Sequence, residues 1–202
     1  MTETAVGRLR LCGELAFLAL SILSLPGTAL AAPPAPYIPM GEEADAPTGF
    51  VQMCQREPTL CSTSAPPDVA TPEKKQRHML AFVNGDVNGS VLQRTDYDLF
   101  GTDERWQRPG KRAGAAGDCE DLALEKRERL IERGFPPSDL FFAVVYRREF
   151  GLHTVLVART DRGDYVLDSL TGRLAPWQEA PYSWLRVQKP GDPHIWYRVA
   201  RS

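Results

Sequence analysis

The amino-acid sequence predicts an α+β domain in which helical segments come first along the chain and strands second. Two segments between residues 73 and 134 have the apolar spacing or the helix-forming residues of α-helices. After Pro137 the pattern changes to short runs of β-branched and aromatic residues, which are typical of antiparallel strands. The predicted domain therefore has N-terminal helices packed on an antiparallel sheet.

The composition is that of an ordinary globular chain. Of the 202 residues, 43% are hydrophobic and 25% are charged, which excludes a fully disordered or fibrous protein. The formal net charge is −2, and no stretch forms a basic block. We therefore expect no nucleic-acid partner and no polybasic membrane anchor.

The first 31 residues have the pattern of a signal peptide. Two arginines precede an apolar segment that is densest over residues 16–25, and these ten residues are too few for a bilayer-spanning helix, which needs about 20. The Ala29-Leu30-Ala31 sequence suits signal peptidase, so we expect cleavage before Ala32. This interpretation predicts export without stable membrane insertion of the mature chain. An uncleaved anchor is the alternative.

Residues 32–48 follow as a proline-rich, acidic segment. It contains five prolines and three acidic residues, a composition that cannot bury a core. We therefore expect a disordered leader over 32–48 and a folded domain over 49–202.

The four cysteines have different predicted fates. Cys12 leaves with the signal peptide, whereas Cys54 and Cys61 are close enough to form a disulfide in an exported protein. A metal pair or a redox dithiol is the alternative for these two, but the spacing is not Cys-x-x-Cys and no histidine is near. Cys119 is left over.

The first predicted helix starts at Thr71 and Pro72, as N-cap and first helical residue. Apolar residues then recur every four positions from Met79 to Val91 and mark its core-facing side. Residues 95–114 are charged and irregular, and we expect a long surface connection there, of the kind that is often functional.

The second predicted helix carries the remaining cysteine in its first turn. Asp118 is suited to be its N-cap, and Asp121 stands three positions on, where a carboxylate can return to the cap backbone. The helix is expected to end at Gly134. Cys119 therefore lies at a helix N-terminus, where the helix dipole favours a thiolate.

The predicted strands occupy residues 140–147, 153–159 and 164–170, with a further candidate at 195–200. A turn joins the second strand to the third, so the start of one faces the end of the other. His153 and Asp168 occupy these two positions and can be cross-strand neighbours. The carboxylate could then orient the imidazole toward the Cys119 thiol, as in an activated cysteine nucleophile.

Each of these three residues also has a structural interpretation. A lone cysteine is often a small core residue, a histidine on a strand is often a satisfied polar group, and an aspartate near a turn often makes local hydrogen bonds. Their joint placement favours the catalytic interpretation. His78 and His194 lie in charged or turn sequences, and we expect both at the surface.

Three segments carry a resemblance to a known family. Gly117-Asp118-Cys119-Glu120-Asp121, Gly151 to Leu156 and Val166 to Leu170 resemble the motifs of the bacterial transglutaminase-like cysteine proteinases. The preceding residues Asn84, Asn88, Tyr97, Gly101, Asp103, Trp106 and Pro109 are similar to the family's lead-in, so the resemblance covers about 50–197.

The resemblance implies a papain-like or transglutaminase-like core, a periplasmic location and a triad of Cys119, His153 and Asp168. The best-understood relatives are calcium-dependent periplasmic proteases that clip a large surface adhesin, and the resemblance admits a membrane protein as regulator. The sequence departs from them in its compact size, in the Cys54 and Cys61 pair, and in Ser169, where an asparagine is expected. These departures argue against an adhesin as the substrate more than they argue against cysteine-peptidase chemistry.

The same resemblance implies calcium as a cofactor, with Asp118 and Glu120 as ligands and Asp121 as a weaker candidate. A hard cation on these oxygens would neutralise the negative charge that otherwise opposes a Cys119 thiolate. The alternative is that Asp118 and Asp121 only cap the helix and that Glu120 is solvated.

The predicted function is therefore a periplasmic cysteine peptidase that cleaves a protein or peptide substrate through an acyl-enzyme. Two alternatives remain open. A transglutaminase or amide-transfer enzyme would use the same triad and resolve the acyl-enzyme with an amine, and a non-catalytic binding module would use the same groove.

Overall fold

The computed structural model describes Met1, residues 36–63 and residues 73–200. The predicted signal peptide, the first residues of the predicted leader and the helix start at Thr71 and Pro72 lie outside the described residues. Within the described part of the chain, no helix has the length and apolarity needed to cross a membrane.

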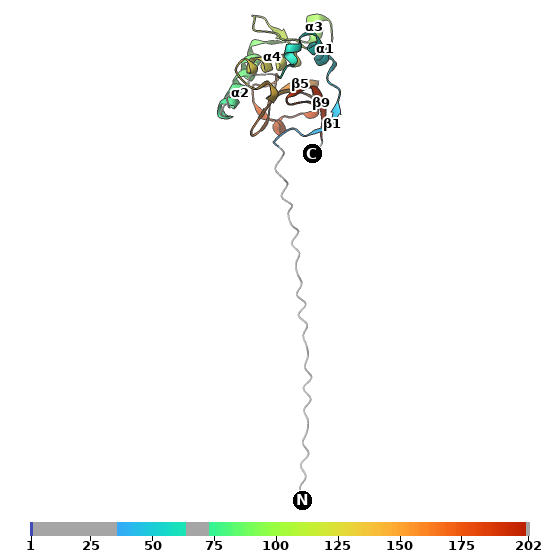
Figure 1. The fold of residues 1–202 in the computed structure, drawn as a ribbon, viewed down its shortest axis with the longest axis vertical. Coiled ribbons are helices and arrows are strands. Elements are labelled where there is room, and N and C mark those ends of the chain that lie inside the picture. Colours follow the sequence, from blue (N-terminus) through green and yellow to red (C-terminus); the bar gives the residue numbers. More distant parts are fainter. Residues whose placement is uncertain (2–35, 64–72, 201–202) are drawn as a thin grey trace. The chain divides into compact units, whose positions relative to one another are not determined.

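Helices and strands follow one another as the sequence predicts, with most helices in the first half (Figure 1). In chain order, with η for 3₁₀ helices, the elements are β1 (Met40–Ala44), α1 (Thr48–Arg56), η1 (Pro58–Cys61), α2 (Glu73–Ser90), β2 (Leu92–Gln93), α3 (Asp96–Phe100), β3 (Ala116–Gly117), α4 (Cys119–Ile131), η2 (Pro137–Asp139), β4 (Leu140–Arg147), β5 (Gly151–Thr160), β6 (Gly163–Leu167), β7 (Ala175–Pro176), η3 (Trp177–Glu179), β8 (Ser183–Lys189) and β9 (Asp192–Val199).

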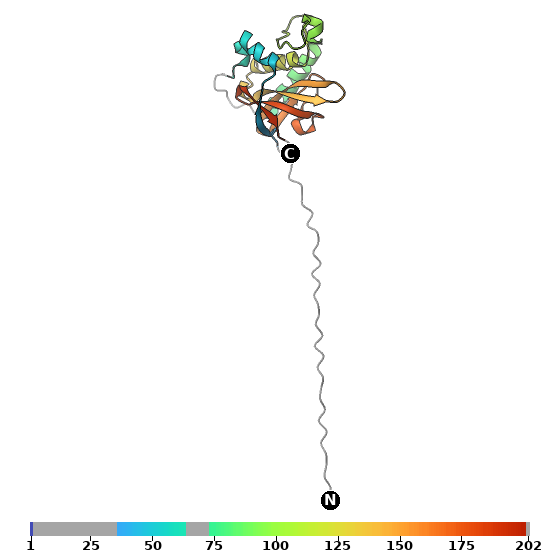
Figure 2. The same ribbon diagram turned by 90° about the vertical axis from the view of Figure 1, so that its right-hand side faces the viewer.

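The main sheet has seven strands in the order β1-β9-β8-β4-β5-β6-β7, and all neighbours are antiparallel. The α-helices lie on one side of these strands (Figure 2). Helix α4 packs against β5 of the sheet and against α2. The predicted α+β class is confirmed, and so are the strands expected at 140–147, 153–159 and 195–200. The third predicted strand ends earlier, at Leu167.

The central strands are buried on both faces. Along β4, Leu140 and Phe142 join the core beneath the helices, whereas Phe141, Ala143 and Val145 join a second core on the opposite face. The second core is bounded by the outer strands and by side chains before β1 and after β7. This two-sided burial explains why strand β4 reads as a continuous apolar run rather than an alternating one.

The second core extends the folded domain to Pro36, so the leader prediction is wrong for residues 36–48. Ile38 is buried, and its backbone N–H donates to Asp164 Oδ2 at 2.8 Å. Strand β1 pairs with β9 along the sheet edge. The carboxylates Glu42, Glu43 and Asp45 of this segment are exposed, while the edge of the sheet satisfies backbone groups of the segment.

Residues 95–114 are not only a surface connection, contrary to prediction. They contain α3 and the indole of Trp106, which is 1% exposed and packs edge-on against Phe50 and Phe142, with ring centroids 5.3 and 5.1 Å away. A Cβ on Gly49 would lie 2.7 Å from the Trp106 ring, so the indole needs glycine there. The connection is therefore anchored in the core next to α4.

The predicted disulfide between Cys54 and Cys61 is present and joins α1 to η1. Arg127 of α4 donates to the carbonyl oxygens of Leu60 and Ser62 at 3.1 and 2.7 Å. The cross-linked loop is thereby attached to the helix that begins with Cys119.

Candidate active site

Cys119 is the first residue of α4 and the one free cysteine of the described chain. Helix α4 is buried along nearly its whole length, so its N-terminus is held at a fixed position against the sheet. Asp118 is the N-cap residue as predicted, but its carboxylate makes no capping hydrogen bond and instead accepts from the Asp96 N–H at 3.3 Å. The expected capping box with Asp121 is therefore absent.

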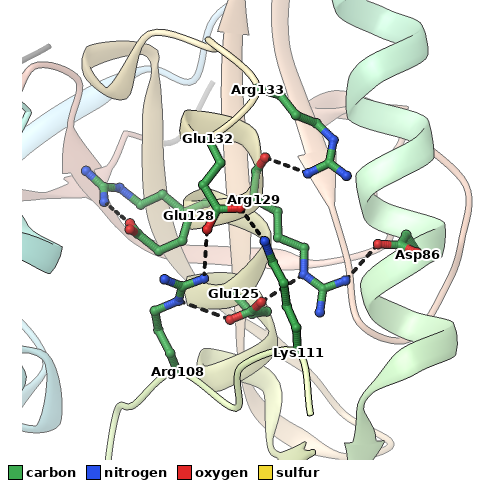
Figure 3. A network of polar contacts seen from close by, with 9 residues as sticks. Asp86, Arg108, Lys111, Glu125, Glu128, Arg129, Glu132 and Arg133 are labelled. Carbon is green, nitrogen blue, oxygen red and sulfur yellow. Dashed lines mark hydrogen bonds and ion pairs between the residues drawn. The ribbon is translucent and has the colours of Figure 1, made fainter. Parts of the chain in front are cut away.

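Two buried charges of α4, Glu125 and Arg129, are paired with each other and with neighbouring elements (Figure 3). Glu125 accepts from Arg129 Nε at 2.8 Å and from Arg108 Nε at 3.1 Å. Arg129 also donates to Asp86 of α2 at 2.7 Å. These pairs tie α4 to α2 and to the loop before β3, and so fix the helix on which Cys119 is carried.

His153 and Asp168 are in contact, as the sequence predicts. His153 Nε2 lies 2.8 Å from Asp168 Oδ1, and both side chains are about 5% exposed. The two residues are diagonal rather than directly opposite, because Leu156 pairs with Leu167 and the ladder ends there. Burial by itself would raise the pKa of Asp168, but hydrogen bonds from His153, Leu170 and Tyr182 outweigh it and lower this pKa.

The Cys119 thiol lies in the same cleft as the histidine. Its Sγ contacts Glu120 Oε2 at 3.0 Å and accepts from the Thr154 N–H at 3.3 Å. Burial and the neighbouring Glu120 carboxylate raise the pKa of Cys119 well above its ordinary value. In this arrangement the thiol form is favoured, and a nearby cation would shift the balance toward the thiolate.

The cleft beside Cys119 has a volume of about 620 Å³ and is lined by two of the three catalytic candidates, Cys119 and His153. Thr154, Val144 and the 69% exposed Leu152 form part of its wall. Its other lining residues are Asp45, Ala46, Pro47, Thr48, Asp103, Glu104, Asp118, Glu120 and Arg186.

A cluster of carboxylates lies beside the cleft. Asp96, Asp118 and Asp121 each place an oxygen within 4.8 Å of the others. Asp121 Oδ1 accepts from the Gln107 N–H at 2.7 Å, and Asp96 Oδ2 accepts from the Arg105 N–H. The structure thus brings together two of the three predicted metal ligands, but with Asp96 in place of Glu120.

The cluster fits a hard cation. One oxygen of each carboxylate is buried without a hydrogen-bond partner among the described residues, namely Asp96 Oδ1, Asp118 Oδ1 and Asp121 Oδ2. Burial and the Glu120 carboxylate raise the pKa of Asp118 to about 7, whereas burial and repulsion by Asp118 and Asp96 raise that of Asp121 to about 9. Oxygens that are dry, unpaired and close together are suitable ligands for calcium.

Gly117 allows this packing of carboxylates. A Cβ at this position would lie 2.6 Å from Asp121 Oδ2 and 2.6 Å from Asp121 Cβ. The glycine that precedes the Asp-Cys-Glu-Asp sequence therefore gives the Asp121 side chain room to turn toward Asp96 and Asp118.

Sequence reasoning missed three groups around the site, two of them buried and one partly buried. Asp96 lies 22 residues before Asp118, and Tyr182 donates to Asp168 from beyond β7, so no local pattern links either residue to the motifs. Lys126 is fully buried, and its Nζ has no hydrogen-bond partner in the part of the chain that the structure describes. Burial lowers the pKa of Lys126 to about 7, against the opposing effect of Asp168 and Cys119. His78 and His194 are exposed, as predicted.

A free cysteine at the start of a buried helix, packed on an antiparallel sheet that carries a His-Asp pair, defines a transglutaminase-like cysteine peptidase. The family model of the bacterial transglutaminase-like cysteine proteinases (BTLCP) matches residues 40–202. The chain belongs to this family and is a cysteine peptidase.

Solved structures share the fold. Calcium-bound LapG of Legionella pneumophila superposes with a TM-score of 0.51 and 20% identity, over 78% of this chain and 85% of that chain. A further structure of LapG from the same organism gives a TM-score of 0.49 and 23% identity, over 60% of this chain and 68% of that chain. EGTA-treated LapG gives a TM-score of 0.46 and 24% identity, over 55% of this chain and 62% of that chain. A search of curated proteins found no match.

Proposed function

We propose that the protein is a periplasmic cysteine endopeptidase that cleaves an envelope or surface protein, with Cys119, His153 and Asp168 as its triad. The observation that carries the proposal is that Cys119 and His153 line one cleft and that His153 contacts the buried Asp168. The location rests on the N-terminal signal-peptide pattern.

Each member has a role in the proposed mechanism. Asp168 accepts from His153 Nε2, which leaves Nδ1 to take the Cys119 proton. The thiolate then attacks a peptide carbonyl, the scissile C–N bond breaks, and the His153 proton goes to the leaving amine. Water hydrolyses the acyl-enzyme, and the Cys119 N–H at the helix N-terminus stabilises the oxyanion.

The experiment is a search for new N-termini. Envelope proteins from cells that lack this protein are incubated with the purified protein and calcium, and the N-termini that appear are labelled and identified by mass spectrometry. We expect a small set of new N-termini. Their absence would contradict peptidase activity, and products that carry an added primary amine instead of water would identify an amide-transfer enzyme.

We also propose that Asp96, Asp118 and Asp121 bind calcium. Three unpaired buried oxygens support the site, and LapG, which shares the fold, has a calcium-bound form. The bound cation would supply positive charge beside Cys119. Glu120, a candidate from the sequence, contacts the thiol and interacts with Asp118, but it is not one of the three residues whose carboxylate oxygens cluster.

Calcium is expected to raise the melting temperature by about 5–10 °C when its concentration is about 100 times Kd, because it binds the folded state alone. Differential scanning calorimetry in calcium and in EGTA measures this shift. Asp96→Asn should abolish the shift, whereas Glu120→Gln should keep it. Loss of the shift in the Glu120 variant alone would show that Glu120, and not Asp96, is the ligand.

The calcium-free protein is expected to lose stability as the pH rises. The pKa values of about 7 for Asp118 and about 9 for Asp121 lie above the value of about 4 in an unfolded chain. The folded state then binds more protons than the unfolded state between pH 4 and 9, so the free energy of unfolding falls through this range. Urea unfolding at pH 5 and pH 8 measures the change. A fall of equal size with saturating calcium would contradict ion binding by these carboxylates.

A further inference from the structure

We propose that Tyr182 is a positioning residue that fixes the Asp168 carboxylate and, through it, the His153 ring. This inference rests on the proposed triad. Tyr182 lies outside the three motifs that indicate the family, on the segment between η3 and β8.

Both oxygens of Asp168 are held by separate donors. Oδ1 accepts from His153 Nε2 at 2.8 Å and from the Leu170 N–H at 2.9 Å. Oδ2 accepts from the Tyr182 hydroxyl at 2.5 Å, and this is the one hydrogen bond of Oδ2 within the described residues. The carboxylate therefore cannot rotate without losing at least one of these hydrogen bonds.

The Tyr182 ring also packs against the imidazole. The ring centroids of His153 and Tyr182 are 5.8 Å apart, and Phe150 meets His153 edge-on at 5.6 Å and Tyr182 at 6.3 Å. The two aromatic rings thus stand beside the His-Asp pair and help to keep it dry. A hydrogen bond that is shielded from water orients its partners more strongly than an exposed one.

The backbone before Tyr182 holds the residue in place. Its N–H donates to the Ala180 carbonyl at 2.8 Å, and Ala180 N–H donates to Trp177 O at 3.3 Å. Tyr182, Ala180 and Trp177 pack against the second core. The tyrosine is therefore supplied by a rigid corner of the sheet and not by a free loop.

The consequence for catalysis is a fixed tautomer. Because Asp168 accepts from Nε2, the neutral imidazole carries its proton there and presents Nδ1 as the acceptor for the thiol proton. Without the Tyr182 hydroxyl, Oδ2 loses its donor and the carboxylate is free to turn. The imidazole then spends less time aligned, which affects the proton-transfer steps and not substrate binding.

The first test is kinetic and compares Tyr182→Phe with the matched control Tyr197→Phe, which removes a hydroxyl from strand β9. The substrate is a peptide that spans the cleavage site found by N-terminal labelling. We expect kcat of Tyr182→Phe to fall about 10-fold with KM within about twofold, since general acid-base catalysis contributes 10²–10⁴-fold in all. Tyr197→Phe should match the wild type. An unchanged kcat, or a loss that appears in KM alone, would overturn the inference.

The second test needs no substrate. The chain has three histidines, and His78 and His194 are exposed, so ¹⁵N-labelled protein gives an imidazole spectrum in which the buried His153 is distinguishable. We expect the wild type to show the Nε2–H tautomer, and Tyr182→Phe to shift the His153 Nε2–H resonance while His78 and His194 stay in place. A spectrum identical to that of the wild type would contradict the inference even if the protein cleaves no peptide. Absence of Cys119-dependent cleavage in the wild type would instead contradict the proposed triad.

Discussion

Replacement of Cys119 by alanine is expected to lower the cleavage rate by at least about 10⁴-fold, the largest effect predicted for any single residue of this protein. Without the sulfur no acyl-enzyme forms, and oxyanion stabilisation and binding alone give only a small residual rate. The rate is measured as the appearance of new N-termini on the identified peptide, at equal enzyme concentrations and in saturating calcium.

The fold of the alanine variant should remain intact. The thiol is partly exposed, and the contacts it gives up are one to Glu120 and one from the Thr154 N–H. The disulfide between Cys54 and Cys61 is independent of it. The melting temperature should therefore stay within a few degrees of that of the wild type. Cleavage at more than a few per cent of the wild-type rate in this variant would exclude Cys119 as the nucleophile.

The His-Asp contact could be predicted from the sequence because it depends on a hairpin. The turn that contains Asp161 and Gly163 fixes which ends of two adjacent strands meet, and this determines the neighbours of His153 to within about two residues. The position of Cys119 at a helix N-terminus could also be predicted from nearby residues, because helix-forming residues follow it without interruption up to Gly134. Short-range rules of this kind are strong enough to place side chains.

The missed features all depend on contacts between distant segments. Ile38 is buried because its N–H meets Asp164, 126 residues away, and not because its own segment is apolar. Asp96 joins Asp118 because a buried Trp106 draws the intervening loop onto the core. Composition alone describes both segments as polar and irregular, since the partners that bury them become apparent only with the folded sheet.

The buried ion pairs of α4 lead to the largest stability effect that we predict. Glu125 is fully buried and accepts from both Arg129 and Arg108, as Figure 3 shows. Replacing Glu125 by glutamine keeps the shape of the side chain but removes its negative charge, and leaves Arg129, which is 5% exposed, with Asp86 as its one carboxylate partner within the described residues. Loss of one member of a buried pair costs about 3–5 kcal/mol, so we expect the free energy of unfolding to fall by about 3 kcal/mol.

Urea unfolding gives the free energies of unfolding of Glu125→Gln and Glu132→Gln, and so compares the loss of a buried glutamate charge with the loss of an exposed one. Glu132, the C-cap residue of α4, contacts Arg108 and Lys111, but its side chain is 42% exposed, so its loss should cost less than about 1 kcal/mol. The Glu125 pairs stabilise the helix that starts with Cys119 but do not contact the thiol. In saturating calcium, the catalytic rate of the Glu125→Gln variant should therefore fall only by the fraction of molecules that are unfolded. Equal destabilisation by the two substitutions would show that the Glu125 network is not what holds α4 against α2 and the preceding loop.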